Sequence, residues 1–254
     1  MPLPTRLNAA PLIEAVFELW FSAPSPAASV LPGILLSQVE ILRGGKVNRL
    51  AAADLPREMR DSDPKLRRLA LVGIDSPHCA VLIGDYSLAV VAPTPYPGWT
   101  SFSKSIEAIV KAVLDSGQLV AVERCSLRYR DLFPVKSGTD RMSVLKAQIS
   151  VGTRTDRSGP VNARIEYRDP LLIHIVEIAT HADSQVENQP IRSGLLLSVD
   201  TVAQHLEKNT DVQAFMDKLD TQLHSMHTAN KELFFDCLTQ ETIDQLEPEY
   251  HVSE

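Results

Sequence analysis

The chain opens with alternating apolar and polar residues that predict a half-buried strand. Over residues 12–22, the apolar side chains at the odd positions 13 to 19 fall on one face, and Glu14 and Glu18 fall on the other. Two carboxylates on one strand face repel each other unless something compensates them. The strand therefore raises the question of what neutralises or uses Glu14 and Glu18.

Helical and strand patterns then alternate. Apolar residues at helical spacing predict a helix over 29–43, which Gly44 and Gly45 end. The stretch 46–68 is charged and contains two prolines, which is typical of a loop. In 69–92, three short β-rich runs are separated by turn residues, and this arrangement predicts an antiparallel meander.

A second helix and a long strand complete the first half of the chain. One apolar face predicts a helix that begins at Thr100 or Ser101 and ends at Gly117. The strand predicted over 118–133 places arginines on one face and apolar residues on the other. The order of elements up to this point resembles the β-α-β-β-α-β ferredoxin-like plan.

The second half is predicted to be mostly strand and to end in a long helix. Strands are expected over 143–153, 161–168, 171–180 and 194–202. Apolar spacing then predicts one helix over 211–237 and a shorter helix near 239–247.

No linker or internal repeat divides the sequence. We therefore expect an α+β fold in a single unit over 1–254, with a mainly antiparallel sheet and helices on one face. Residues 1–135 and 140–254 are candidate halves of that unit.

Composition narrows the class of protein. With 254 residues, 44% hydrophobic and 22% charged, the chain is typical of a globular protein. Its three cysteines form no C-x-x-C pair, which favours a reducing compartment over a disulfide framework or a zinc ribbon. No apolar run approaches the length of a membrane span or a signal peptide, so a cytoplasmic protein with no membrane contact is expected.

Charge is distributed unevenly along the sequence. The net charge is −7, and residues 200–254 contain 12 acidic against 3 basic side chains. Nucleic-acid-binding domains usually show a basic excess, because neutralising phosphates supplies much of their affinity. Nucleic acid therefore stays a less favoured partner.

The common catalytic motifs are absent. The sequence has no P-loop, no G-x-G-x-x-G or G-x-S-x-G motif, and no zinc-protease or deaminase signature. Asp220, His224 and His227 lie at helical spacing that a metal could use, but solvated helix-face histidines are commoner. We expect no metal, no cofactor and no catalytic residue, although an enzyme with a different kind of site stays open.

A set of arginines on two predicted strands is the most informative group. Three of them share one strand face, where like charges repel unless they are compensated. Intramolecular carboxylates, an acidic protein partner and a phosphate-bearing ligand are the three alternatives, and cross-strand ion pairing comes first. The candidate residues for binding a partner or an anion are Arg124, Arg128, Arg130, Arg164, Arg168, Glu14 and Glu18.

Four segments carry a resemblance to a known family. They are APLIEAVFELWF, the YPGW that precedes a helix, VERCSLRYRDLF, and LHSMHTANKELFFDCLTQETIDQL near the end. In order and spacing they resemble an uncharacterised, sporadically distributed prokaryotic family of about this length. Arg124 and Arg128 match its strand pattern, RLGLRYIN, whereas Arg130 and Asp131 depart from it. The resemblance implies no catalytic residue or cofactor, and the sporadic distribution implies an accessory role, as in defence.

Two functions follow as hypotheses. The first is a non-enzymatic protein-interaction component, accessory or antitoxin-like in a defence or mobile-element system, with a protein partner or a second copy of itself. The alternative is a binder of an anionic ligand or nucleic acid that uses the arginine-rich sheet face, with an enzyme as a further option.

Overall fold

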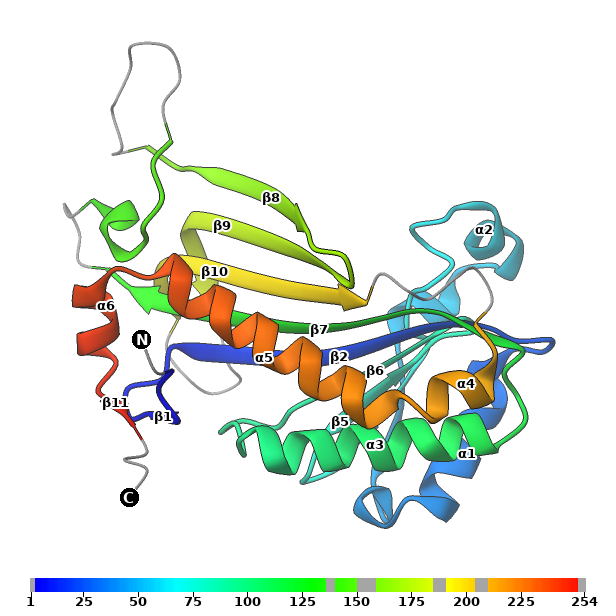
Figure 1. Cartoon of the computed structure of the whole chain (residues 1–254). Coiled ribbons are helices and arrows are strands. Elements are labelled where there is room, and N and C mark those ends of the chain that lie inside the picture. The colour runs from blue at the N-terminus through cyan, green and yellow to red at the C-terminus, as the bar shows by residue number, and fades with distance from the viewer. Residues whose placement is uncertain (1–2, 136–139, 150–158, 185–190, 204–209, 251–254) are drawn as a thin grey trace.

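One long antiparallel sheet forms the centre of the molecule (Figure 1). A computed structural model describes residues 3–135, 140–149, 159–184, 191–203 and 210–250. The nine strands lie in the order β3-β4-β5-β6-β2-β7-β10-β9-β8. Their bounds are β2 Leu12–Ser22, β3 Lys46–Arg49, β4 Val72–Asp75, β5 Ala80–Ile83, β6 Ser87–Val91, β7 Ala121–Pro134, β8 Asn162–Arg168, β9 Leu172–Ser184 and β10 Arg192–Ala203.

Helices cover one face of this sheet, as the apolar patterns predict. The α-helices are α1 Ala27–Gln38, α2 Arg57–Ser62, α3 Trp99–Asp115, α4 Val212–Met216, α5 Leu219–Cys237 and α6 Gln240–Gln245. The helices α1, α3 and α5 pack against the same face, and α2 lies apart from them (Figure 1). A short pair of strands, β1 Arg6–Leu7 and β11 Pro248–Glu249, brings the two ends of the described chain together. The expected α+β class with helices on one face is confirmed.

The main core lies between β2, β7 and these helices. Phe17 and Leu19 of β2 are fully buried, together with Leu31 of α1 and Ile106 of α3. These side chains sit at the odd strand positions and at the helical spacing that the sequence pattern marks. A second cluster of buried residues joins β9 and β10 to the end of α5. The helix-covered face is therefore the apolar face, as expected.

The helix expected over 29–43 is shorter than predicted, because α1 ends at Gln38 and a 3-10 helix follows at Glu40–Leu42. Three further expectations about elements are wrong. The charged stretch 46–68 is not a loop, because it contains β3, a 3-10 helix at Ala51–Asp54, and α2. The strand expected at 143–153 begins in a 3-10 helix, Arg141–Val144, and its last part lies outside the described residues. The single helix expected over 211–237 is two helices, interrupted after Met216.

The ferredoxin-like plan stays an expectation for the first half. The strand order β5-β6-β2-β7 places the first strand between the last two, which is compatible with that plan. The added strands β3 and β4 extend the same sheet beyond β5. Of the helices in the described part of the chain, none is long and apolar enough to span a membrane.

Candidate functional site

The open face of the sheet, opposite the helices, carries the arginines identified from the sequence. Glu14 lies 3.5 Å from a guanidinium nitrogen of both Arg128 and Arg130. Arg124 lies 3.1 Å from Asp200, and its guanidinium group stacks 4.3 Å from the ring centre of Trp20. The ion pairing predicted for Glu14 and the arginines of this strand is therefore present.

The other members of the set lie on the same face but do not join one site. Arg164 and Arg168 belong to the edge strand β8, which β9 and β10 separate from β7. Arg164 lies 3.5 Å from Glu177, and Arg168 pairs with Glu166. Glu18 stands opposite Ser126 and has no ion pair with any residue that the structure describes. Carboxylates within the chain thus compensate all five arginines.

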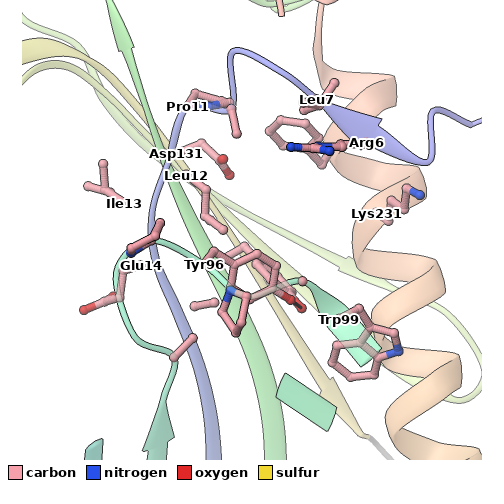
Figure 2. A pocket seen from close by; sticks show the side chains of 18 of the residues that line it. Arg6, Leu7, Pro11, Leu12, Ile13, Glu14, Tyr96, Trp99, Asp131 and Lys231 are labelled. Atoms are coloured by element: carbon pink, nitrogen blue, oxygen red, sulfur yellow. Dashed lines mark hydrogen bonds between the residues drawn. The ribbon is translucent and has the colours of Figure 1, made fainter. Parts of the chain in front are cut away.

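The other face contains a pocket that the sequence patterns did not predict. It has a volume of about 740 Å³ and lies between the first turn of α3, the middle of α5 and the N-terminal segment (Figure 2). Its lining is mostly apolar and aromatic, with a few polar groups among these residues, and we call it the Asp131 pocket. The volume and the mostly apolar lining of this pocket are typical of small-molecule binding sites. The polar residues that matter below are Arg6, Tyr96, Tyr129, Asp131, His227, Asn230 and Lys231.

Local backbone features place these residues around one cavity. Opposite Arg130 and Asp131, β2 contains a bulge between Leu12 and Glu14, so the register shifts by one residue where the strand borders the pocket. Gly98, with a φ of 87°, adopts a left-handed conformation that favours glycine and starts α3 at Trp99 instead of the expected Thr100 or Ser101. On α5, positions 227, 230 and 231 fall on one face by helical spacing.

Asp131 is the most unusual group in the pocket. Its side chain is only 4% exposed, and it borders the cavity (Figure 2). Within the described part of the chain, its carboxyl group has no hydrogen-bond or ion-pair partner. Burial raises the pKa of Asp131 to about 8, because desolvation disfavours the charged form. At neutral pH the group is therefore mostly an uncharged acid with an O–H to donate.

A row of uncharged polar groups runs along one wall. The hydroxyl groups of Tyr96 and Tyr129 are 3.3 Å apart, and that of Tyr129 is 3.2 Å from Nδ1 of His227. Burial lowers the pKa of His227 to about 4 and raises that of Tyr96 to about 12. The imidazole is thus neutral and can accept a hydrogen bond from Tyr129 or donate one to it, depending on its tautomer.

Asn230 of α5 lines the same pocket. Its Nδ2 lies within hydrogen-bond distance of the backbone oxygens of Leu127 and Val199 and of Oγ1 of Thr201. These contacts fix the orientation of the buried amide, which is 2% exposed. Its Oδ1 accepts no hydrogen bond from any described residue. The contacts of its Nδ2 make Asn230 a fixed part of the pocket wall.

Two cations lie toward the end of the pocket opposite Tyr96 and Trp99 in Figure 2. Arg6 and Lys231 form no ion pair with a carboxylate in the described ranges. Arg6 stands opposite Glu249 in the β1–β11 pair, but that carboxylate accepts a hydrogen bond from Asn8. Partial burial lowers the pKa of Lys231.

Few sequence patterns point to this site. The sequence marks His227 only as one of three residues at a spacing that a metal could use, and Asp131 only as a departure from a family pattern. No three His, Cys, Asp or Glu side chains among the described residues are grouped as a metal site. One signal was available: an aspartate at an odd position of the strand 118–133, on the face that the apolar residues bury.

Comparisons with known proteins add no function. A scan against protein-family models finds no match, and a comparison with curated proteins finds no similar sequence. The resemblance to the sporadically distributed prokaryotic family stays a prediction. Function is therefore argued from the Asp131 pocket.

Proposed function

We propose that the protein binds a small organic molecule in the Asp131 pocket. The observation that carries the proposal is the buried carboxyl group of Asp131, which lines a cavity of about 740 Å³ and has no partner in the described part of the chain. Leaving a buried polar group unpaired destabilises a fold by about 1–3 kcal/mol, so such a group calls for an explanation. A ligand that hydrogen-bonds Asp131 supplies one.

The rest of the lining supports a ligand with an apolar or aromatic body. Tyr96 and Trp99 lie at one end of the pocket, and Phe234 of α5 also lines it. Flat aromatic side chains give a large contact area and favour aromatic ligands by offset or edge-to-face packing. The polar groups of the lining, among them Asp131 and the Tyr96–Tyr129–His227 row, can fix a ligand's orientation by hydrogen bonds.

A fragment screen by saturation-transfer NMR tests this function. Ala10 is an exposed residue that lines the pocket, so Ala10→Trp adds a large side chain there. The neighbouring Ala9 is also exposed but does not line the pocket, which makes Ala9→Trp the matched control. We expect fragments with aromatic bodies to bind the wild type and the Ala9 variant and to be lost in the Ala10 variant. A screen without such fragments would contradict the proposal.

A protein-interaction role remains a second proposal, with a second copy of the chain as partner. The strand β8 is at the edge of the described sheet, and its Ile165 and Tyr167 are 39% and 49% exposed. If two copies paired β8 antiparallel about Ile165, Arg164 of each would stand opposite Glu166 of the other. Exposed strand edges readily pair in this way.

Sedimentation velocity tests this second function. We expect a dimer for the wild type and a monomer for Ile165→Asp, with Val47→Asp on the opposite edge strand β3 as the control. A wild-type monomer at high concentration would contradict the β8 interface. The accessory or antitoxin-like role expected from the sequence would then need a different partner.

A further inference from the structure

We propose, building on the ligand-binding function above, that the Asp131 pocket selects organic molecules with an anionic head group. In this proposal Arg6 and Lys231 attract the head group, and the carboxyl group of Asp131 donates a hydrogen bond to it. A carboxylate, sulfonate or phosphate shares the required chemistry, which is negative charge on oxygen atoms that accept hydrogen bonds.

The charges that border the pocket favour an anion. Arg6 and Lys231 have no carboxylate partner in the described ranges, so their positive charge is uncompensated. Glu14 also borders the pocket, but its carboxylate lies 3.5 Å from both Arg128 and Arg130. Arg6 is exposed and Lys231 is partly buried, and opposite charges attract more strongly at a partly buried site than in water. An anionic head group would gain from both cations.

Asp131 fits an anion because its buried carboxyl group is uncharged at neutral pH. Its pKa of about 8 leaves it protonated there, and a carboxylic acid can donate a short, strong hydrogen bond to an anionic oxygen. A cationic ligand would need the charged form of this buried group and would lie close to two positive side chains. Burying such a charge is unfavourable without close pairing. The geometry therefore favours the anion.

The protonation state of Asp131 gives the proposal a pH signature. The titratable or charged groups that line the pocket around Asp131 come from five segments. They are Tyr129 of β7, Glu14 of β2, Arg6 of β1, His227 and Lys231 of α5, and Tyr96 before α3. His227 has a pKa of about 4 and Tyr96 a pKa of about 12, so both side chains are neutral between these pH values. The pKa of Tyr129 is raised well above 10. The two remaining groups that can change charge are Asp131, whose pKa is raised, and Lys231, whose pKa is lowered. The experiment therefore has to distinguish the effects of these two groups.

The direction of the pH dependence follows from the protonation state of Asp131 that binds the anion. Below about pH 8 Asp131 holds its proton, and anion affinity should be constant. Above that pH the ionised carboxylate repels the anion, so affinity should fall by up to tenfold per pH unit, or roughly 30-fold by about pH 9.5. Loss of the proton from Lys231 would act in the same direction. Asp131→Asn removes the first effect only, because asparagine stays uncharged.

A pair of fluorescent probes with the same aromatic body tests the proposal. Anilinonaphthalene sulfonate carries an anionic group, and N-phenylnaphthylamine lacks it. Titrations use the wild type and Ala10→Trp, with Ala9→Trp as control, so that only binding in the pocket is counted. Lys231→Met is compared with Lys65→Met, because Lys65 is exposed and does not line the pocket.

Four results are expected. In the pocket the sulfonate should bind the wild type at least about tenfold more tightly than the neutral probe at neutral pH, as one added charge-assisted contact implies. Lys231→Met should reduce that preference, whereas Lys65→Met should not. The wild-type preference should fall above about pH 8, and Asp131→Asn should flatten that fall.

Failure of this inference differs from failure of the pocket itself. If the neutral probe binds in the pocket as tightly as the sulfonate, or if the sulfonate's affinity rises with pH, the anion proposal is wrong and the ligand pocket stands. If neither probe is affected by Ala10→Trp, both are wrong. The wild-type pH profile decides the issue even if the Asp131 variant folds poorly.

Discussion

The imidazole ring of His227 lies flat on the indole ring of Trp99, with ring centres 4.1 Å apart and planes 7° from parallel. The contact joins the first residue of α3 to the middle of α5 at the edge of the Asp131 pocket. It shields the imidazole from water, and Nδ1 of the same ring hydrogen-bonds with Tyr129. Burial of the ring is the main reason for its low pKa.

This stacking leads to a prediction for the titration of the histidines. The pKa of His227 should be about 4, well below the ordinary value for histidine. Histidine-resolved NMR over the acid range measures it directly, and Trp99→Ala should raise the value by opening the ring to water. A His227 pKa near that of an exposed histidine would contradict the stacked, buried geometry.

Stability against pH should follow from the same shift. His227 has an ordinary pKa of about 6.5 in the unfolded state and a pKa of about 4 in the folded state. Between these pH values the unfolded state binds more protons than the folded state, so the free energy of unfolding falls as the pH drops from about 6.5 toward about 4. His227→Gln should lessen this acid-side loss. Urea unfolding at two pH values in that window measures it, with His78→Gln, at an exposed residue outside the pocket, as the control. Equal losses in wild type and His227→Gln would exclude this contribution.

Asp131 predicts the opposite dependence at higher pH. Its folded pKa, about 8, is raised above its ordinary 3.8, so the unfolded state loses the proton first and the free energy of unfolding falls as the pH rises between these values. Asp131→Asn should therefore be more stable than the wild type near pH 8, by a few kcal/mol, and similar to it near pH 4. Urea unfolding measures this gap, with exposed Asp236→Asn as control. A gap that did not widen with pH would be contrary evidence.

The sequence predicted the strands that border this site, and the faces of their side chains, better than the pocket itself. Alternation in residues 12–22 and 118–133 correctly placed Glu14 and the arginines on one face, because side-chain direction in a strand depends only on parity. The same parity placed Asp131 among the apolar side chains. What lies above it depends on α3, α5 and the N-terminal segment, and no local pattern reports how such distant segments approach one another.

The wrong expectations have similar causes. Residues 46–68 are charged, and β3 and α2 expose most of their side chains, so no apolar periodicity marks either element. The break between α4 and α5 falls at Asp217 and Lys218, neither of which is a helix breaker such as glycine or proline. In both regions tertiary contacts, and not local preference, set the element bounds.

Asn230 gives a prediction about stability. Its Nδ2 is within reach of the carbonyl oxygens of Leu127 and Val199 on two neighbouring strands. Asn230→Ala would remove these buried hydrogen bonds and should lower the free energy of unfolding by roughly 1–3 kcal/mol. Chemical denaturation measures the loss, and His224→Ala, exposed on the same helix, should change stability little. A neutral Asn230→Ala would mean that these carbonyls find other donors.

The open sheet face gives a prediction about what its two glutamates do. Glu14 is shared by Arg128 and Arg130, whereas Glu18 has no ion pair within the described residues. Because these partners are partly exposed, Glu14→Gln should lower the free energy of unfolding by only about 0.5–1 kcal/mol, and high salt should reduce the difference. Glu18→Gln should change it less, since no pair is lost.

The same two variants test whether this face binds anions. Removing Glu14 leaves two arginines uncompensated, so affinity for a polyanion such as heparin should increase in Glu14→Gln and decline steeply as salt is added. Glu18→Gln removes the same charge four residues along the strand and breaks no ion pair. If both variants bound heparin equally, net charge alone would explain the effect. A larger gain in Glu14→Gln would show that Glu14 holds Arg128 and Arg130 away from anionic partners.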